Sequence, residues 1–193
     1  MSTQENQPAS RLQFHPVTKE RLRDLARFSC EHGKFRYCSC MRWRMTSSQF
    51  RQSTTETRVA ALEALVEQDI PTGVLAYADE EPIGWCSVAP RERYAALERY
   101  QALPRLDDRA VWSVVCFFVD RRFRRQGVTT RLLKAAVSYA QSQGAAIVEG
   151  YPVESDARLY TYMGSPEAFL RAGFRDVTPP GQARLVMRCW LTP

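Results

Sequence analysis

The sequence predicts a mixed α/β (α+β) fold organised around one parallel βαβ unit. A continuous apolar run over residues 111–119 is followed by a basic turn, an amphipathic helix over 128–143 and a second apolar run over 145–153. A strand, a helix and a strand within about 40 residues form a βαβ unit with parallel strands. Upstream, the apolar runs 74–78 and 83–89 flank a short polar turn and predict an antiparallel hairpin.

Length and composition predict one domain in a cytoplasmic protein. The 193 residues suffice for a proper core, and 45% hydrophobic with 25% charged residues is ordinary for a globular chain. No apolar run reaches the roughly 20 residues that span a membrane, and the polar N-terminus lacks the basic and apolar regions of a signal peptide. We therefore expect a disordered lead-in over residues 1–10, one domain over 11–193 and no membrane partner.

Three elements are expected before the hairpin. A first strand covers residues 12–17, a helix starts at Lys19 behind the N-cap Thr18, and a second helix covers 54–68. The segment between the two helices, residues 35–45, is aromatic, basic and rich in sulfur, and it has no clear periodicity. It therefore predicts neither a helix nor a strand.

The remaining elements follow the hairpin. A polar, partly helical insertion over 91–108 leads to the central strand, which is apolar on both faces and so is expected to be buried. Gly144 is placed to end the helix behind it. The apolar stripe of that helix comprises Val128, Leu132, Leu133, Ala136, Val137 and Ala140. The last expected elements are a loop over 156–164, a short helix begun by Ser165 and Pro166, and a closing strand pair over 174–177 and 184–191.

Four arginines gather in the turn between the central strand and the helix, namely Arg121, Arg122, Arg124 and Arg125. Backbone N–H groups at the start of a helix bind phosphate, and the helix dipole favours negative charge there. The net charge of the chain is +6, but a local cluster suits a small polyanion better than a long polymer. The turn therefore predicts a phosphate-binding loop, and nucleic acid is not an expected partner.

Three short motifs stand at residues 117–120 (FFVD), 124–129 (RRQGVT) and 169–174 (FLRAGF). Together they resemble the GNAT superfamily of N-acetyltransferases. Residues 124–129 resemble its acyl-CoA pyrophosphate loop, of pattern Q/R-x-x-G-x-G/A, residues 117–120 resemble its central strand, and residues 169–174 resemble its late short helix, which ends in Gly-Phe. The order of elements matches over residues 12–191. The resemblance implies a GNAT-like fold: a largely antiparallel twisted sheet with a central parallel βαβ unit, flanked by helices.

The same resemblance implies an enzyme that moves an acetyl group from the cosubstrate acetyl-CoA to a primary amine of a small molecule or peptide. The amine would attack directly in a ternary complex. The pantetheine arm would pair with the backbone of residues 117–119, where an N–H could also stabilise the thioester oxyanion. The residues implied for acetyl-CoA are Phe117, Phe118, Val119, Arg124, Arg125, Gln126, Gly127, Val128, Thr129 and Thr130.

Two positions depart from the family pattern. Thr129 stands where the loop usually has glycine or alanine, although its N–H can still donate. Phe169 stands where many members carry the tyrosine that protonates the leaving thiolate, and a phenyl ring has no proton to give. Tyr151, Tyr160 and Tyr162 are the alternative donors, each with a packing role as its simpler interpretation. We favour Tyr160 or Tyr162, because their loop is expected to pass near the catalytic cleft.

Glu149 is the predicted base, since an amine acceptor must lose a proton to attack. It stands mid-strand in an apolar run beside the predicted CoA strand. A carboxylate there is either functional or salt-bridged to an arginine, and both alternatives stay open. Cys116 could act as a nucleophile in a ping-pong route, but His15 and His32 are remote in sequence. A buried core cysteine is therefore the preferred interpretation.

The segment between the first two helices allows two interpretations. Its four potential zinc ligands are Cys30, His32, Cys38 and Cys40. Their spacing is not that of a standard finger or ribbon, so no metal is expected. The alternative is a wall of the acceptor site formed by Phe35, Tyr37, Met41 and Trp43, a region that commonly lines that site in the family the chain resembles. Arg42 and Arg44 would then favour an acceptor that bears a carboxylate or phosphate.

Two other functions stay open on the sequence. Phe169 allows a non-catalytic acyl-CoA-binding regulatory module. The basic charge permits a tRNA-directed acetyltransferase, although no basic stripe interleaved with aromatic residues demands one. The acceptor, the acyl chain length and the oligomeric state are not defined by the sequence, and a homodimer is one option.

Overall fold

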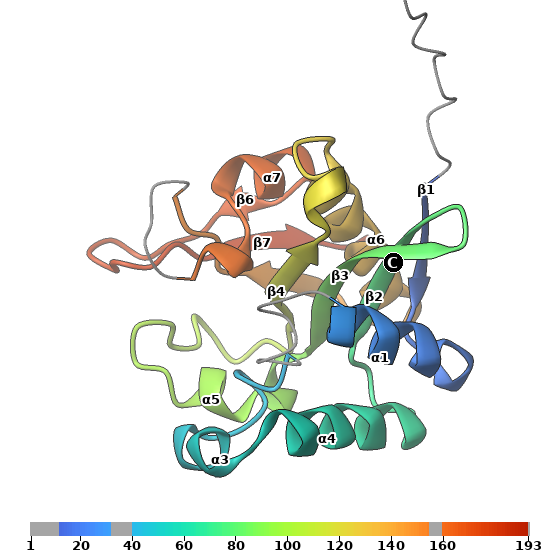
Figure 1. Cartoon of the computed structure of the whole chain (residues 1–193). Helices are drawn as coiled ribbons and strands as arrows, with labels where there is room; N and C mark the ends of the chain where they lie inside the picture. Colours follow the sequence, from blue (N-terminus) through green and yellow to red (C-terminus); the bar gives the residue numbers. More distant parts are fainter. Residues whose placement is uncertain (1–11, 32–39, 155–159, 193) are drawn as a thin grey trace, which may run out of the picture.

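The computed structural model describes residues 12–31, 40–154 and 160–192 of the chain. Within these residues one seven-stranded sheet has the order β1-β2-β3-β4-β5-β7-β6 (Figure 1). The strands are β1 (Leu12–Pro16), β2 (Gly73–Ala78), β3 (Glu81–Pro90), β4 (Trp112–Val119), β5 (Ile147–Gly150), β6 (Arg175–Asp176) and β7 (Met187–Trp190).

Helices cover both faces of the sheet. They are α1 (Leu22–Glu31), α3 (Ser47–Gln52), α4 (Thr55–Glu67), α5 (Ala95–Glu98), α6 (Val128–Ser142) and α7 (Pro166–Arg171). Four short 3-10 turns accompany them: η1 (Lys19–Arg21), η2 (Arg91–Arg93), η3 (Arg121–Phe123) and η4 (Thr161–Met163). Among the described residues, no helix combines the length and apolar character that crossing a bilayer requires.

Two hydrophobic clusters hold these layers together, one on each face of the sheet. On one face α6 and α7 pack through residues such as Leu132, Leu133 and Phe169. On the other face α1 and α4 pack through residues such as Phe28 and Leu62. Five of the six residues in the predicted stripe of α6 are buried, and Val137 is half-buried. The predicted amphipathic character of this helix is confirmed.

The sheet is largely antiparallel, and one parallel pair lies at its centre. β4 and β5 are parallel and joined by α6, whereas the other neighbouring strands pair antiparallel. The predicted fold class, the βαβ unit and the hairpin of β2 and β3 are therefore confirmed. The closing pair, β6 and β7, is also antiparallel.

The central strand is paired along its whole length on one edge only. β4 pairs with β3 from Trp112 to Val119, but it pairs with β5 only from Trp112 to Val114. β5 ends at Gly150, opposite Val114. The register also shifts within β4, so that Val115 is an extra residue, and a bulge of this kind bends a strand. Residues 115–119 therefore present a strand edge that β5 does not cover.

Some local predictions need correction. The helix α3 was not expected, although Thr46 and Gln49 form a capping box at its start. Thr18 precedes a 3-10 turn rather than an α-helix and makes no side-chain cap bond. The predicted strand over 145–153 is only four residues long in the structure, because the chain leaves β4 after Gly150. The predicted lead-in over residues 1–10 lies outside the described residues.

Candidate active site

Asp120 holds the turn that joins β4 to α6. Its backbone N–H donates to the carbonyl of Ile83 at 2.8 Å. Its carboxylate accepts the backbone N–H of Arg122 at 2.9 Å and pairs with the Arg122 guanidinium at 2.6 Å. Glu81 pairs with the same guanidinium. Hydrogen bonds, first to Asp120 and then to Glu81, raise the pKa of Arg122. Arg122 therefore stabilises the turn through its ion pairs and is already occupied by them.

The turn ends in a helix start whose N–H groups have no partner among the described residues. Arg125 and Gly127 adopt left-handed backbone conformations, with φ of 63° and 74°. Gly127 is the N-cap of α6, and the N–H of Arg131 donates back to its carbonyl at 3.1 Å. The N–H groups of residues 128–130 precede that bond, and no side chain caps them. They are oriented as an anion-binding site requires.

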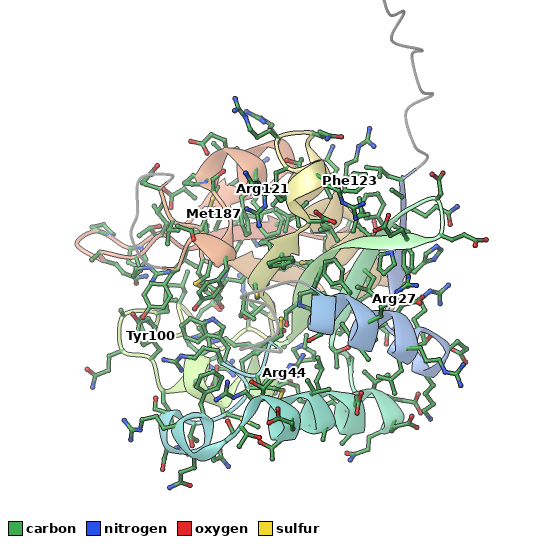
Figure 2. The ribbon with its side chains drawn as sticks, in the orientation of Figure 1. Arg27, Arg44, Tyr100, Arg121, Phe123 and Met187 are labelled. Carbon is green, nitrogen blue, oxygen red and sulfur yellow. The ribbon has the colours of Figure 1, made fainter. Side chains whose placement is uncertain are left out.

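The other arginines of the turn divide into two kinds. Arg124 also stabilises the turn, because its Nε donates to the carbonyl of Val119 at 2.9 Å. Arg121, Arg125 and Arg131 are exposed and form no ion pair within the described parts of the chain. Figure 2 shows Arg121 beside the turn, above the end of β4. Arg131 was missed from the sequence, although its position four residues after Gly127 places it in the first turn of α6.

The predicted pantetheine strand forms the uncovered edge of β4. Phe117 packs on the α6 face, with its ring centroid 6.0 Å from that of Phe169. Phe118 points to the opposite face, 5.6 Å from the ring of Phe28. The side chains therefore anchor both faces, and the backbone of residues 115–119 forms the edge between them. This edge runs directly into the arginine turn.

Phe169 is fully buried where β5 separates from β4. Its ring packs against Phe174 at 4.9 Å. It also fills the space beside two glycines: a Cβ at Gly150 would meet the ring at 2.1 Å, and one at Gly164 would meet it at 3.0 Å. Phe169 stands at the position where the family resemblance led us to look for a tyrosine. Its ring carries no proton donor.

Glu149 belongs to a buried ionic network. Its side chain is 1% exposed. Oε1 accepts from Arg91 at 2.8 Å and from the Tyr151 hydroxyl at 2.7 Å, and Oε2 accepts from Arg188 at 2.7 Å. Arg188 continues the network to Asp107 at 2.6 Å. Of the two sequence alternatives, the salt bridge is the one present here, and both carboxylate oxygens are already engaged.

Tyr151 and Tyr160 differ in their suitability as proton donors. Tyr151 is fully buried in the ionic network, where burial and then the charge of Glu149 raise its pKa. Tyr160 is only half-buried, and its hydroxyl accepts that of Tyr100 at 3.4 Å. The pKa of Tyr160 is raised, first by the hydrogen bond with Tyr100 and then by burial. Tyr162 is also half-buried, with its ring 6.1 Å from that of Tyr160.

The predicted acceptor wall is described in part. Phe35 and Tyr37 lie outside the described residues. Trp43 is buried beside Tyr160, with 6.1 Å between the ring centroids. Arg42 lies 5.7 Å from the ring of Trp43. The expected ligand role of Arg44 does not suit its position. This buried side chain donates to the carbonyls of Pro71 and Thr72 and stacks 4.6 Å over Tyr94.

The cysteines whose side chains the structure describes, namely Cys40, Cys86, Cys116 and Cys189, are free thiols. Cys116 is buried in the core, and His15, the one imidazole in the described residues, lies on β1 with its ring 5.7 Å from Tyr77. Of the suggested zinc ligands, only the side chain of Cys40 is described, and it accepts the indole N–H of Trp85. Within the described residues no three potential ligands cluster. The zinc interpretation as a whole lies outside them.

A hollow of about 320 Å³ opens on another part of the molecule, between the end of β1, the end of α4 and the C-terminal end of α6. A helix of the length of α6 spans roughly 22 Å, so this hollow is far from the arginine turn at the other end. Asp69, the charged residue in its lining, is already paired with Lys19 at 2.8 Å. The other polar side chains of its described lining carry hydroxyls and one amide, and we place the candidate site at the open edge of β4.

The comparison with known families agrees with this geometry. A model of the acetyltransferase (GNAT) family matches residues 38–164, which include the open edge of β4, the arginine turn and α6. The chain belongs to the GNAT acetyltransferase family. No curated protein matches the sequence.

Solved acetyltransferase structures share the fold at low sequence identity. The PaiA N-acetyltransferase from Thermoplasma acidophilum, determined with coenzyme A, is 12% identical with a TM-score of 0.51, covering 94% of this chain and 99% of its own. YncA from Salmonella typhimurium, determined with acetyl-CoA, is 14% identical with a TM-score of 0.52 and 94% coverage of both chains. A GNAT acetyltransferase from Streptococcus pneumoniae is 14% identical with a TM-score of 0.51, covering 94% of this chain and 100% of its own.

Proposed function

We propose that this GNAT protein is an N-acetyltransferase that moves an acetyl group from acetyl-CoA to a primary amine by direct attack in a ternary complex. One observation carries the proposal. The open strand edge of residues 115–119 leads straight into a turn with free arginines and a helix N-terminus. An amide-bearing arm joined to a pyrophosphate needs these two features in this order, and coenzyme A has both groups. Two solved structures of the same fold were determined with CoA or acetyl-CoA.

The donor would bind in two parts. The pyrophosphate would accept the N–H groups of residues 128–130, and Arg121 and Arg125 would add charge-assisted contacts. The pantetheine amides would pair with the backbone of residues 117–119. An N–H on that edge would stabilise the oxyanion that forms on the thioester carbonyl. Most of the rate enhancement would come from holding the thioester and the amine in line.

Tyr160 is the proposed proton donor to the leaving CoA thiolate. Its half-buried hydroxyl lies 3.4 Å from that of Tyr100 and carries a proton that it can donate. Its raised pKa keeps that proton in place at neutral pH. The turn η4, which follows Tyr160, packs on β4. Tyr162 is the second candidate on the same turn.

Glu149 takes a positioning role in this proposal. The predicted base would need a free oxygen, whereas both of its oxygens accept from arginines. The network joins β5 and β7 to the segment after β3, and it lies where β5 is about to leave β4. Loss of the amine proton is assigned to water at the open site. Glu149 would fix β5, β7 and the segment after β3 relative to one another just before β5 leaves β4.

The test is an assay of free thiol released from acetyl-CoA across a panel of amines. The proposal requires amine-dependent release, and it requires Arg125→Gln to raise the dissociation constant of CoA measured by calorimetry. Arg99→Gln, at an exposed arginine outside the turn, is the matched control. Absence of CoA binding would refute the donor site, and absence of release with every amine would refute the transfer.

One observation favours a second candidate, a non-catalytic acyl-CoA-binding module. Phe169 fills the position of the usual acid with a buried ring that cannot donate a proton. Tight CoA binding without thiol release for any amine, in the same experiment, would support this function over the enzyme.

A further inference from the structure

Three aromatic side chains from distant parts of the chain meet beside η4. Trp43 comes from the turn before α3, Tyr100 follows α5 and Tyr160 is the residue just before η4. The ring centroid of Trp43 lies 5.5 Å from that of Tyr100 and 6.1 Å from that of Tyr160. The rings of Tyr100 and Tyr160 are 6.3 Å apart, and both are half-buried (Tyr100 is labelled in Figure 2). We refer to these three residues as the aromatic cluster.

Two arginines at the aromatic cluster have no carboxylate partner in the described parts of the chain. The guanidinium of Arg184 stacks 4.7 Å over the ring of Tyr160. The guanidinium of Arg42 lies 5.7 Å from the ring of Trp43. Both act on the Tyr160 hydroxyl electrostatically, against the stronger effects of its hydrogen bond with Tyr100 and of burial. Arg184 thus lies on the ring of Tyr160, and Arg42 lies beside the neighbouring ring of Trp43.

Arg42 and Arg184 differ from the arginines of the molecule that are paired with carboxylates. Arg91 and Arg188 are buried and paired with acidic side chains, and the exposed Arg122 is paired as well. Arg42 and Arg184 are half-buried instead, with aromatic rings against them. Partly desolvated cations of this kind attract an anion more strongly than exposed ones do, because water screens them less.

Two buried donors at the cluster also lack acceptors. Nε1 of Trp43 and Nε of Arg184 have no hydrogen-bond partner among the described residues. Buried N–H groups are rarely left unpaired in folded proteins. A ligand that brings an oxyanion to Arg184 would supply acceptors where the protein supplies none. Arg184 otherwise donates only weakly, to the carbonyl of Tyr151 at 3.5 Å and to the sulfur of Met163 at 3.4 Å.

The cluster adjoins the open edge of β4. Met163 and Tyr151, which Arg184 contacts, belong to the same buried core as Val115 and Cys116 of β4. η4 packs directly on β4. An acceptor seated at the cluster would therefore lie next to the strand edge proposed for the thioester and next to Tyr160.

We infer that the acceptor is an alkyl amine that carries both an aromatic ring and an oxyanion. The first candidate is an aromatic α-amino acid, whose oxyanion is its carboxylate. The inference rests on the proposed function and names its acceptor class. The ring of the acceptor packs against Tyr100 and Tyr160, the two half-buried rings of the cluster, with the buried Trp43 behind them. Its oxyanion binds Arg184 and Arg42 through charge-assisted hydrogen bonds. Its amine then faces the open edge of β4.

The test compares three acceptors that differ only in the anion: phenethylamine, phenylalanine and the phosphonate analogue of phenylalanine. Each is assayed for thiol release from acetyl-CoA, and its binding to the CoA-saturated protein is measured by calorimetry. One strong charge-assisted contact corresponds to about a tenfold effect or more. We expect kcat/KM for phenylalanine to exceed that for phenethylamine by at least about tenfold. Comparing kcat/KM and the dissociation constant of phenylalanine with those of its phosphonate analogue shows whether the site prefers a carboxylate or a phosphonate.

Variants assign the preference to the arginines. Arg184→Gln and Arg42→Gln are expected to lower the ratio of kcat/KM for phenylalanine over phenethylamine by about tenfold. Arg184→Lys, which keeps the charge, should retain part of the ratio. Arg175→Gln, at an exposed arginine of β6, is the control and should leave the ratio as it is. A merely structural role for Arg184 would lower both activities together and leave the ratio intact.

The outcomes separate this inference from the proposed function. Transfer to amines with no preference for the anion, or a preference that survives both glutamine variants, would overturn the acceptor class and leave the transferase standing. Carboxylate-selective binding without thiol release would overturn the transfer and keep the anion site. The inference predicts both selective binding and selective transfer.

Discussion

The ring of Phe169 lies directly against the Cα atom of Gly150, so closely that a Cβ at Gly150 would be 2.1 Å from the ring. Gly150 is the last residue of β5, at the point where this strand stops pairing with β4. The Phe169 ring is thus packed at the point where β5 separates from β4, in the space that is left because Gly150 has no side chain. Phe169 here has a packing role where proton donation was expected from the family pattern.

Gly150→Ala should destabilise the protein by about 1–3 kcal/mol, because the added methyl group overpacks a filled core. Urea unfolding of the variant and of wild type measures the difference. Phe169→Leu makes space, so the double variant Gly150→Ala/Phe169→Leu should lose less stability than the sum of the two single losses. Additive losses would show that the two side chains do not compete for this space.

Gly127→Ala should weaken CoA binding as well as folding. The φ of 74° is costly for alanine, by about 1–2 kcal/mol, and it sets the direction of the free N–H groups at the start of α6. Gly144→Ala is the matched control, since Gly144 lies at the other end of the same helix and has a φ of 82°. At both glycines an added methyl group would meet no described atom within 4 Å, so neither substitution causes a clash. Both variants should lose similar stability, but only Gly127→Ala should raise the dissociation constant of CoA in calorimetry. An equal effect on CoA would argue against this helix start as the pyrophosphate site.

Glu149→Gln should be strongly destabilising, by about 3–5 kcal/mol, since it leaves Arg91 and Arg188 buried without their shared carboxylate. Thermal unfolding at neutral pH measures the loss. The exposed pair of Lys19 and Asp69 offers a control, and Asp69→Asn should change the unfolding temperature little. If Glu149→Gln folds normally but abolishes transfer, Glu149 is the base and its positioning role is wrong.

Asp107 should contribute to the loss of stability in acid. Its hydrogen bond with Arg188 lowers its pKa below the ordinary value of 3.8. A carboxyl whose pKa is lower in the folded state stabilises the fold above its ordinary pKa, and this contribution is lost as the pH falls through the folded value. Asp107→Asn should therefore reduce stability at neutral pH and flatten the fall in stability below about pH 4. An unchanged slope of stability against pH would contradict this role.

Tyr160→Phe should lower kcat by about 100-fold or more if Tyr160 protonates the thiolate, with a smaller effect on the dissociation constant of CoA. Tyr162→Phe on the same turn is the comparison. Because the pKa of Tyr160 is raised, the rate should not fall through deprotonation of Tyr160 until the pH exceeds the ordinary tyrosine value of 10. A loss of rate that follows Tyr162→Phe instead would transfer the role to that residue.

Local patterns in the sequence were sufficient to predict the fold class, and they are the basis for the proposed donor loop. Apolar periodicity predicted the strands and the buried stripe of α6. The arginines and Gly127 predicted a phosphate site at the start of this helix. Both predictions needed only short segments, because the strand, the turn and the helix are adjacent in the chain. Local patterns missed α3, whose short capping box lay in a segment without apolar periodicity. They also overestimated β5, because the length of a strand depends on where its neighbour stops pairing.

Tertiary structure decided the contacts between residues far apart in sequence. Glu149 meets Arg91 and Arg188, which are 58 and 39 positions away, and nothing in the apolar run around Glu149 specified which arginines would reach it. Arg184 reaches Tyr160 and Arg44 turns into the core in the same way. Residue types and spacing determine what a local segment can bind, whereas the partner of a buried charge depends on how the whole sheet closes, and that is a property of the packed chain.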